Sequence, residues 1–197
     1  MSGLRRSSFR ISLALAAGLT VASSAGHADT RVGGAVFPED LKIGSTSLKL
    51  NGVGVRVFYH LVDGYATGLY VVSPSRDEKA LANGPNPKVL YTEFLHDASL
   101  ERVKGEYESI HTHYCKLYAC DAQNEASFAA LTAHLAAAKR GEAQLILVTD
   151  QGVSIQRNGA VVASINDPNF GKGLVQSLLS EAAPTDGFRQ GLLGKAN

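Results

Sequence analysis

The feature that most constrains the fold is a run of three short β-rich segments separated by tight turns. The segments are Ala143 to Thr149, Val153 to Arg157 and Ala160 to Ile165. Asp150-Gln151-Gly152 separates the first two, and Asn158-Gly159, a dipeptide typical of type I′ hairpin turns, separates the last two. Strands joined by so few residues pair in opposite directions. The run therefore predicts a three-stranded antiparallel meander.

The first half of the chain adds strands of the same kind. Val53 to Leu61 alternates apolar residues with others, so that one strand face is wholly apolar. Asp63-Gly64 then marks a turn, and Tyr65 to Val72 returns as a second strand to complete a predicted hairpin. Leu48 to Leu50 and Lys88 to Leu95 are also expected to be extended.

Helical patterns fill most of the remaining stretches. A short helix is expected to begin at a capping box at Ser75 and to end near Asn83-Gly84, and a longer one is expected from Ser99 to about His113. A third helix is capped by Asp121 or Asn124 and ended by Gly141. A fourth runs from Asp167-Pro168 to about Ala182, and a final turn or short helix covers Phe188 to Leu193. Helices and strands are thus segregated along the chain instead of alternating. This order predicts an α+β fold with a largely antiparallel sheet in a single domain.

The N-terminus has the layout of an export signal. Three arginines precede Ile11 to Val21, an apolar stretch that is too short to span a bilayer, and small residues precede a cleavage site after Ala28. An earlier cut after Ala25 and an uncleaved anchor are the alternatives. We therefore expect a signal peptide over residues 1–28 and a mature domain over residues 29–197. That domain is expected to be periplasmic or secreted, without stable membrane insertion.

Charge and composition exclude several classes of protein. The chain has 19 Lys plus Arg against 18 Asp plus Glu, and 45% of its residues are hydrophobic. Such a balance excludes a disordered chain and a multi-pass membrane protein. A nearly neutral domain also has no electrostatic reason to bind phosphate backbones, so no nucleic-acid partner is expected.

The two cysteines of the chain lie close together at the break expected between two helices. Four residues separate Cys115 from Cys120, and an exported protein meets an oxidising environment, which favours a disulfide between them. The alternative is a metal site, because His111 and His113 add the nitrogen ligands that zinc prefers. Their spacing matches no closed zinc motif, so the sequence favours the disulfide and no metal.

One charged residue stands alone in the first hairpin. Arg56 is the only charged residue in the strand before Val62, and it shares a strand face with Phe58 and His60. A guanidinium in an apolar cleft could bind a carboxylate through two hydrogen bonds, or stabilise a developing phenolate or enolate. The alternative is an edge-strand arginine whose head lies in water.

Several stretches together resemble the chalcone isomerase-like family of exported bacterial proteins. Leu50 to Arg56 followed by Tyr65 to Val71 is the first part of this likeness. Further parts follow in the same order along the chain: Phe37-Pro38 upstream, Pro87 to Phe94, Asn158-Gly159 with Ile165, Asp167 to Leu179, and Leu192-Leu193-Gly194. The resemblance covers about Val32 to Gly194.

The resemblance implies an open-faced β-sandwich, in which helices pack on a curved, largely antiparallel sheet and leave a cleft. In the plant enzymes of this family the cleft closes a chalcone into a flavanone, and a strand arginine after Gly-x-Gly-x is a key electrostatic residue; Arg56 stands at the matching place. The other catalytic positions differ, because a threonine position falls near Tyr65. The expected tyrosine, asparagine and last-helix threonine fall near Leu100, near Tyr107 or Glu108, and near Gln176 or Ser177.

These departures favour a binding protein over an enzyme. Relatives of the fold that are not enzymes bind fatty acids, so the resemblance implies a cleft in which Arg56 and Tyr65 bind a small apolar or amphipathic carboxylate. One alternative is an isomerase for a chalcone-like enone or phenol, with Arg56 as the electrostatic catalyst and Tyr65 as a proton donor. The other is a structural or interaction protein whose cleft is filled by its own side chains. No cofactor is expected, and the sequence leaves any protein partner open.

Overall fold

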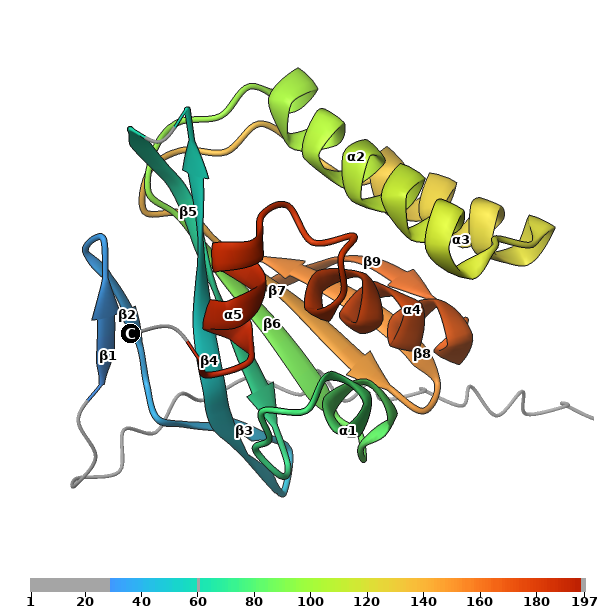
Figure 1. Ribbon diagram of the computed structural model, residues 1–197, viewed down its shortest axis with the longest axis horizontal. Coiled ribbons are helices and arrows are strands. Elements are labelled where there is room, and N and C mark those ends of the chain that lie inside the picture. The colour runs from blue at the N-terminus through green and yellow to red at the C-terminus, as the bar shows by residue number, and fades with distance from the viewer. Residues whose placement is uncertain (1–28, 60, 196–197) are drawn as a thin grey trace, which may run out of the picture.

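The computed structural model describes residues 29–59 and 61–195, and the expected signal peptide lies outside them. Its centre is a curved antiparallel sheet of seven strands in the spatial order β3-β4-β5-β6-β7-β8-β9 (Figure 1). The strands are β3 (Asp40–Ile43), β4 (Thr46–Phe58), β5 (Val62–Val71), β6 (Lys88–Phe94), β7 (Ala143–Thr149), β8 (Gly152–Arg157) and β9 (Ala160–Ile165). Each strand pairs with its neighbour in the chain, which confirms the predicted α+β fold with an antiparallel sheet.

The predicted meander is present with its expected turn. Asn158 and Gly159 have φ values of 48° and 80°, the left-handed conformation that a type I′ turn needs at both central positions. The first hairpin is longer than predicted, because Leu48 to Leu50 and the following strand form the single strand β4. The turn predicted at Asp63-Gly64 is wrong, because β4 ends at Phe58 and both of these residues lie within β5. Irregular register beside Gly52 and between Arg56 and Val57 bends this strand without ending it.

Five helices pack against one face of the sheet, which we call the inner face (Figure 1). They are α1 (Glu78–Asn83), α2 (Leu100–Tyr118), α3 (Ala122–Ala133), α4 (Pro168–Leu179) and α5 (Asp186–Leu192). The largest hydrophobic core lies between the inner face and helices α4 and α5, where Leu179 and Leu192 are fully buried. None of the described helices is both long enough and apolar enough to cross a membrane.

Three helix ends differ from the sequence-based expectation. Asp77, and not Ser75, caps α1. The hydroxyl of Ser75 instead accepts a hydrogen bond from the backbone N–H of Asp77. Helix α2 continues beyond His113 to Tyr118. Helix α3 ends well before Gly141, because the chain after it leaves the helix to pair Ala138 with Ala98 through two backbone hydrogen bonds.

Two glycines of β4 allow α5 to lie directly on the sheet. A Cβ atom at Gly52 would collide with the carbonyl oxygen of Gly191, and one at Gly54 would collide with that of Phe188. The Gly-x-Gly pattern that precedes Arg56 therefore serves close packing between α5 and β4. This packing leaves the end of the strand, with Arg56, beyond the edge of the helix.

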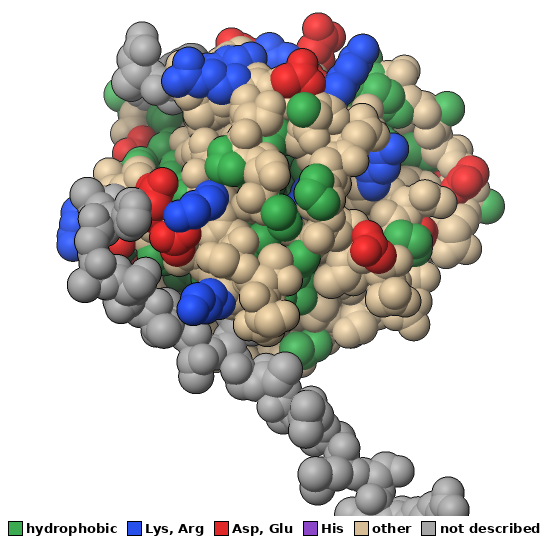
Figure 2. Space-filling view, turned by 90° about the horizontal axis from the view of Figure 1, so that it is seen from below, with side chains coloured by type: hydrophobic (Ala, Val, Ile, Leu, Met, Phe, Trp, Pro, Cys, Tyr) green, Lys and Arg blue, Asp and Glu red, His purple; other side chains and the backbone are tan. Residues whose placement is uncertain are grey.

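The outer face of the sheet is covered in part by a hairpin that the sequence did not predict. Strands β1 (Thr30–Val32) and β2 (Ala35–Phe37) form it, and Phe37 packs against Ala66 and Leu95. On the face seen from below, Lys and Arg side chains lie near Asp and Glu side chains (Figure 2). This mixed surface agrees with the nearly balanced charge of the sequence.

Candidate functional site

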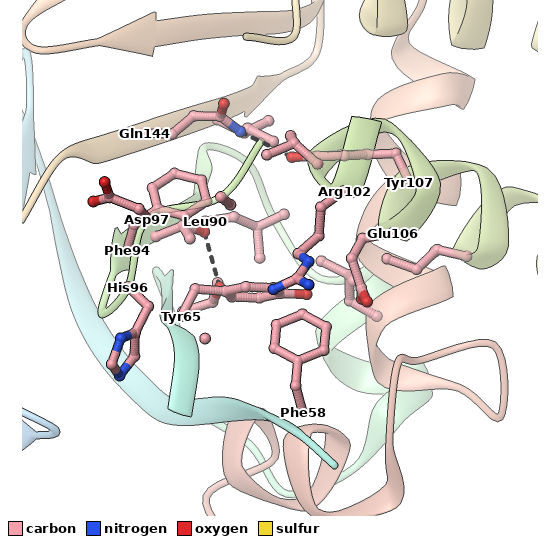
Figure 3. Close-up of a pocket in the computed structure, with 18 of the residues that line it drawn as sticks. Phe58, Tyr65, Leu90, Phe94, His96, Asp97, Arg102, Glu106, Tyr107 and Gln144 are labelled. Atoms are coloured by element: carbon pink, nitrogen blue, oxygen red, sulfur yellow. Dashed lines mark hydrogen bonds between the residues drawn. The ribbon is translucent and has the colours of Figure 1, made fainter. Parts of the chain in front are cut away.

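A cavity lies between the inner face of the sheet and helix α2, with α4 closing its deep end (Figure 3). Its interior volume is about 80 Å³, counted as the space open to the centre of a water molecule. Its walls are Phe58 of β4; Val62, Gly64, Tyr65 and Thr67 of β5; Leu90, Thr92 and Phe94 of β6; His96, Asp97 and Ala98 after β6; Arg102, Val103, Glu106, Tyr107 and Ile110 of α2; Gln144 and Ile146 of β7; and Leu174 and Leu178 of α4. The chain's own side chains therefore leave the cleft open.

The deep end of the cavity is apolar. Leu90 and Ile146 are register partners on β6 and β7, so their side chains lie side by side on the inner face. Ile110 of α2 and Leu174 and Leu178 of α4 face them across the cavity. Such a surface favours a hydrocarbon group over water.

A band of hydroxyl and amide groups crosses the middle of the sheet wall. The hydroxyls of Thr67 and Thr92 are 2.8 Å apart and share a hydrogen bond. The amide of Gln144 donates a hydrogen bond to the Tyr107 hydroxyl on α2, also at 2.8 Å. The band therefore joins the sheet to the helix and satisfies its own polar groups.

Arg56 lies at the mouth end of β4, opposite Tyr65 on β5 in the sheet register. Its guanidinium donates to both carboxylate oxygens of Glu106 on α2, at 3.0 Å from Nε and 2.9 Å from Nη2. Nη1 also donates to the Val57 carbonyl oxygen at 2.9 Å, and the group lies 4.4 Å from the centre of the Phe58 ring. The hydrogen bonds to Glu106 raise the pKa of Arg56, although burial opposes this.

The family resemblance placed Arg56 and Tyr65 in one cleft, and the structure pairs them across β4 and β5, but the sequence did not indicate Glu106 as the partner of Arg56. The two-pronged carboxylate contact expected for a ligand is made by the protein's own Glu106. Arg56 is also not among the residues that line the cavity. Two of its five N–H groups keep no partner among these contacts, but its positive charge is balanced.

Arg102, one turn before Glu106 on α2, supplies the cationic side chain that lines the mouth. It is exposed, its guanidinium carbon lies 5.5 Å from the centre of the Phe58 ring, and it makes no ion pair with the acidic residues that the structure describes. Figure 3 shows it reaching over Phe58 toward Tyr65. No pattern in the sequence distinguishes Arg102 from the other charged residues of the predicted helices.

Tyr65 forms the floor beneath this cation. Its ring packs edge-on against Phe94 and Phe188, with ring centres 6.2 Å and 5.9 Å away. Burial raises the pKa of the Tyr65 hydroxyl well above its ordinary value, and the Glu106 carboxylate raises it further. The group therefore stays neutral and is suited to donating a hydrogen bond.

Of the other positions compared with the plant enzymes, Tyr107 lines the cavity. Leu100 and Glu108 are exposed at the surface of α2. Ser177 is buried in α4, where its hydroxyl donates to the Leu174 carbonyl oxygen at 2.8 Å. Tyr107 already accepts a hydrogen bond from Gln144, so it belongs to the polar band.

The cysteines form the predicted disulfide, between the end of α2 and the loop before α3. The metal ligands considered from the sequence do not all gather there. His113 is exposed and its Nδ1 atom lies 2.7 Å from the Ser109 carbonyl oxygen. Glu125 of α3 takes its place beside His111, Cys115 and Cys120.

Comparison with known proteins agrees with this architecture. A sequence model of the chalcone isomerase-like family matches residues 29–194. The crystal structure of a fatty-acid binding protein from Arabidopsis thaliana superposes with a TM-score of 0.65 at 16% sequence identity, covering 84% of this chain and 96% of that one. At such identity the likeness concerns the fold. No curated protein matches the chain.

Proposed function

The chain belongs to the chalcone isomerase-like family, and from that premise we propose that it is a non-catalytic binding protein for a small amphipathic carboxylate, such as a fatty acid. The ligand's tail lies in the apolar end of the cavity and its carboxylate lies at the mouth. The observation that carries this proposal is an apolar cavity whose mouth holds Arg102, a cation with no ion-pair partner among the described residues. We further propose that the protein acts after export, in the periplasm or outside the cell.

The arrangement of the walls supports a ligand of two halves. Leu90, Ile146 and Leu178 offer the tail an apolar surface, and transfer of a hydrocarbon tail from water to such a surface is favourable. The residues at the mouth carry charge and hydrogen-bond donors. A molecule with one acidic end matches both halves, whereas a uniformly polar molecule would leave the deep end in contact with polar groups.

The charges at the mouth favour an anionic head group. Glu106 is balanced by Arg56, so Arg102 gives this part of the mouth a net positive charge. The neutral hydroxyl of Tyr65 adds a donor on the floor. Arg56 thus acts by compensating Glu106, and Arg102 is the cation that contacts the head group. The crystal structure of the fatty-acid binding protein with the same fold is consistent with such a ligand.

Binding is tested with residues 29–197, stripped of lipid and titrated calorimetrically with saturated fatty acids from octanoic to stearic acid. Arg102→Gln removes the proposed head-group contact, and Lys104→Gln removes an equal charge from α2 at a position that does not line the cavity. We expect Arg102→Gln to weaken binding about tenfold or more, since a hydrogen bond to a charged group contributes about 1.5–3 kcal/mol. Lys104→Gln should bind like the parent protein.

The alkyl alcohol of the same chain length separates the head-group contact from the tail contact. It should bind more weakly than the acid and be insensitive to Arg102→Gln. An acid and an alcohol that bind equally, or a protein that binds neither, would overturn the proposal.

A pair of variants decides whether Arg56 itself binds the carboxylate, as the sequence suggested. Arg56→Ala leaves the Glu106 charge uncompensated at the mouth and should weaken acid binding in either case. Removing both charges in Arg56→Ala/Glu106→Ala should restore most of the affinity if Arg102 holds the head group. An equal loss in the single and double variants would instead make Arg56 the direct contact.

A further inference from the structure

Four side chains with metal-ligating atoms meet at the junction of α2 and α3, away from the cavity mouth. His111 and Cys115 lie one turn apart on α2, Cys120 lies on the connecting loop, and Glu125 lies in the first turn of α3. One ligand atom from each of the four lies within 4.8 Å of all the others. In the structure the two sulfurs are joined as a disulfide.

The spacing of these atoms is that of a tetrahedral ligand set. His111 Nε2 lies 3.3 Å from Cys115 Sγ, 4.0 Å from Cys120 Sγ and 3.7 Å from Glu125 Oε1. Cys115 Sγ lies 3.8 Å from Glu125 Oε1. Zinc bound at roughly 2.0–2.3 Å in a tetrahedron separates neighbouring ligand atoms by about 3.3–3.8 Å. For an ion to enter, the two bonded sulfurs would have to move apart, and Cys120 Sγ would have to move slightly closer to His111 Nε2.

The surroundings hold the histidine in a ligating orientation. The His111 ring stacks on Phe128 of α3, with ring centres 3.8 Å apart and planes within 8° of parallel. This contact directs Nε2 toward the sulfurs. Asn124 Oδ1, at 3.3 Å, is the competing partner of the same nitrogen, and a metal would displace it.

The position of Glu125 follows from the start of α3. The Asp121 side chain accepts a hydrogen bond from the Asn124 N–H at 2.7 Å and so caps the helix. The first turn of α3 then presents Glu125 to the end of α2. The carboxylate is exposed and the other three residues are half-buried, so a reductant and a metal ion can reach the cluster from solvent.

We propose that reduction of the Cys115–Cys120 disulfide turns this cluster into a binding site for zinc or a similar divalent ion, with ligands from His111, Cys115, Cys120 and Glu125. A dithiol reductant supplies the two electrons and two protons. The reductant is oxidised to its own disulfide, and the Cys115–Cys120 bond is reduced to two cysteine thiols. Binding of the ion then releases both thiol protons, because the thiolates are the ligands. The disulfide and the metal are alternative ways to tie α2 to the start of α3.

The full mature chain, reduced with a dithiol that is then removed without air, is titrated with Co²⁺ as a spectroscopic substitute for Zn²⁺. We expect one ion per chain, visible absorption bands of tetrahedral Co²⁺, and sulfur-to-cobalt charge-transfer bands that Zn²⁺ abolishes and Mg²⁺ does not. Native mass spectrometry should find one Zn²⁺ on the reduced chain and none on the oxidised chain.

Variants identify the ligands. His111→Ala should weaken Zn²⁺ binding by at least about tenfold, since even partners that only orient a ligand contribute that much. His113→Ala, on the same helix, is the matched control and should bind like the parent protein. Circular dichroism checks that each variant keeps its helices.

Three results would overturn the proposal. One is the absence of tetrahedral Co²⁺ bands in the reduced parent protein. Another is equal binding by the parent protein and by folded His111→Ala. The third is one ion shared between two chains.

Discussion

Helices α2 and α4 both pack toward the inner face of the sheet, but they are buried to very different extents. Seven of the twelve residues of α4 are buried, whereas only Val103 and Ile110 are buried among the nineteen of α2. Helix α4 lies directly on the core, and the cavity lies between α2 and the sheet. The comparison suggests that α4 holds the fold together, while α2 carries the chemical groups at a lower cost to stability.

The residues of α2 reflect this division of labour. Its first half presents Arg102 and Glu106 to the cavity mouth, and its second half presents His111 and Cys115 to α3. Within the described residues, two hydrogen-bonded side-chain pairs join α2 to the sheet, Arg56 with Glu106 and Gln144 with Tyr107. Substitutions in α4 should therefore affect stability far more than substitutions in α2.

The largest effect is expected from a fully buried leucine of α4. Leu179→Ala should lower the free energy of unfolding by about 2–5 kcal/mol, because it removes buried methyl groups and leaves a cavity. Leu117→Ala on α2 is the matched control: that side chain is 49% exposed, and its loss should change stability by less than about 0.5 kcal/mol. Urea unfolding of both variants measures the difference. Equal losses would end the distinction between the two helices.

The cap of α4 should give the next largest effect. Asp167 accepts hydrogen bonds from the Phe170 N–H at 3.0 Å and from the Ser127 hydroxyl at 2.7 Å, and so fixes the start of α4 and ties α3 to it. Asp167→Ala should lower the free energy of unfolding by about 2–3 kcal/mol, through the lost cap and an unpaired buried hydroxyl. Asp167→Asn, which can still cap the helix, should lose less.

The same residue gives a pH dependence of known sign. Burial alone would raise the pKa of Asp167, but the hydrogen bonds that its carboxylate accepts, led by those from Ser127 and Phe170, together outweigh burial and lower that pKa below its ordinary value. The charged form therefore stabilises the folded state above the ordinary pKa of an aspartate, and this contribution is lost as the pH falls through the lowered value. As the pH is lowered, the difference in the free energy of unfolding between the parent protein and Asp167→Asn should therefore shrink. A constant gap would mean that the charge contributes nothing.

The parts of the fold that follow from the sequence are those with local signals. Asn158-Gly159 set the last hairpin because only a few residues accept the φ values of that turn, and Ser99 and Asp167 cap the helices that their sequences predicted. Strands β1, β2 and β3 could not be found in this way. They have three or four residues each, which is too few for an alternating pattern.

The site could be predicted only as far as single residues. Arg56 stood out as a lone charge on a strand, and the family resemblance added Tyr65. The partner of Arg56 lies fifty residues away on a helix with several glutamates, and no local pattern says which of them faces β4. In the sequence, Arg102 and Glu125 look like any other charged residue of a helix, and only the folded structure shows what lies beside them. Long-range pairing, not composition, makes them parts of a site.

The disulfide should contribute less to stability than the core of α4. Replacing both cysteines, in Cys115→Ser/Cys120→Ser, opens a very short loop and should lower the free energy of unfolding by about 2 kcal/mol on the loop-entropy estimate. Thermal unfolding of the oxidised parent protein and the double variant measures this. A loss as large as that of Leu179→Ala would mean that the end of α2 supports the core itself.

The smallest effect is expected where α2 touches the sheet. Tyr107→Phe removes the hydroxyl that accepts a hydrogen bond from the amide of Gln144, whose residue is 5% exposed. A buried donor left without a partner would cost up to about 3 kcal/mol, but both residues line the cavity, so water can replace the hydroxyl and the loss should be about 1 kcal/mol. Tyr118→Phe, at the exposed end of the same helix, should change nothing measurable. A loss near 3 kcal/mol for Tyr107→Phe would show that water does not reach Gln144, and that the middle of α2 is held as firmly against the sheet as α4.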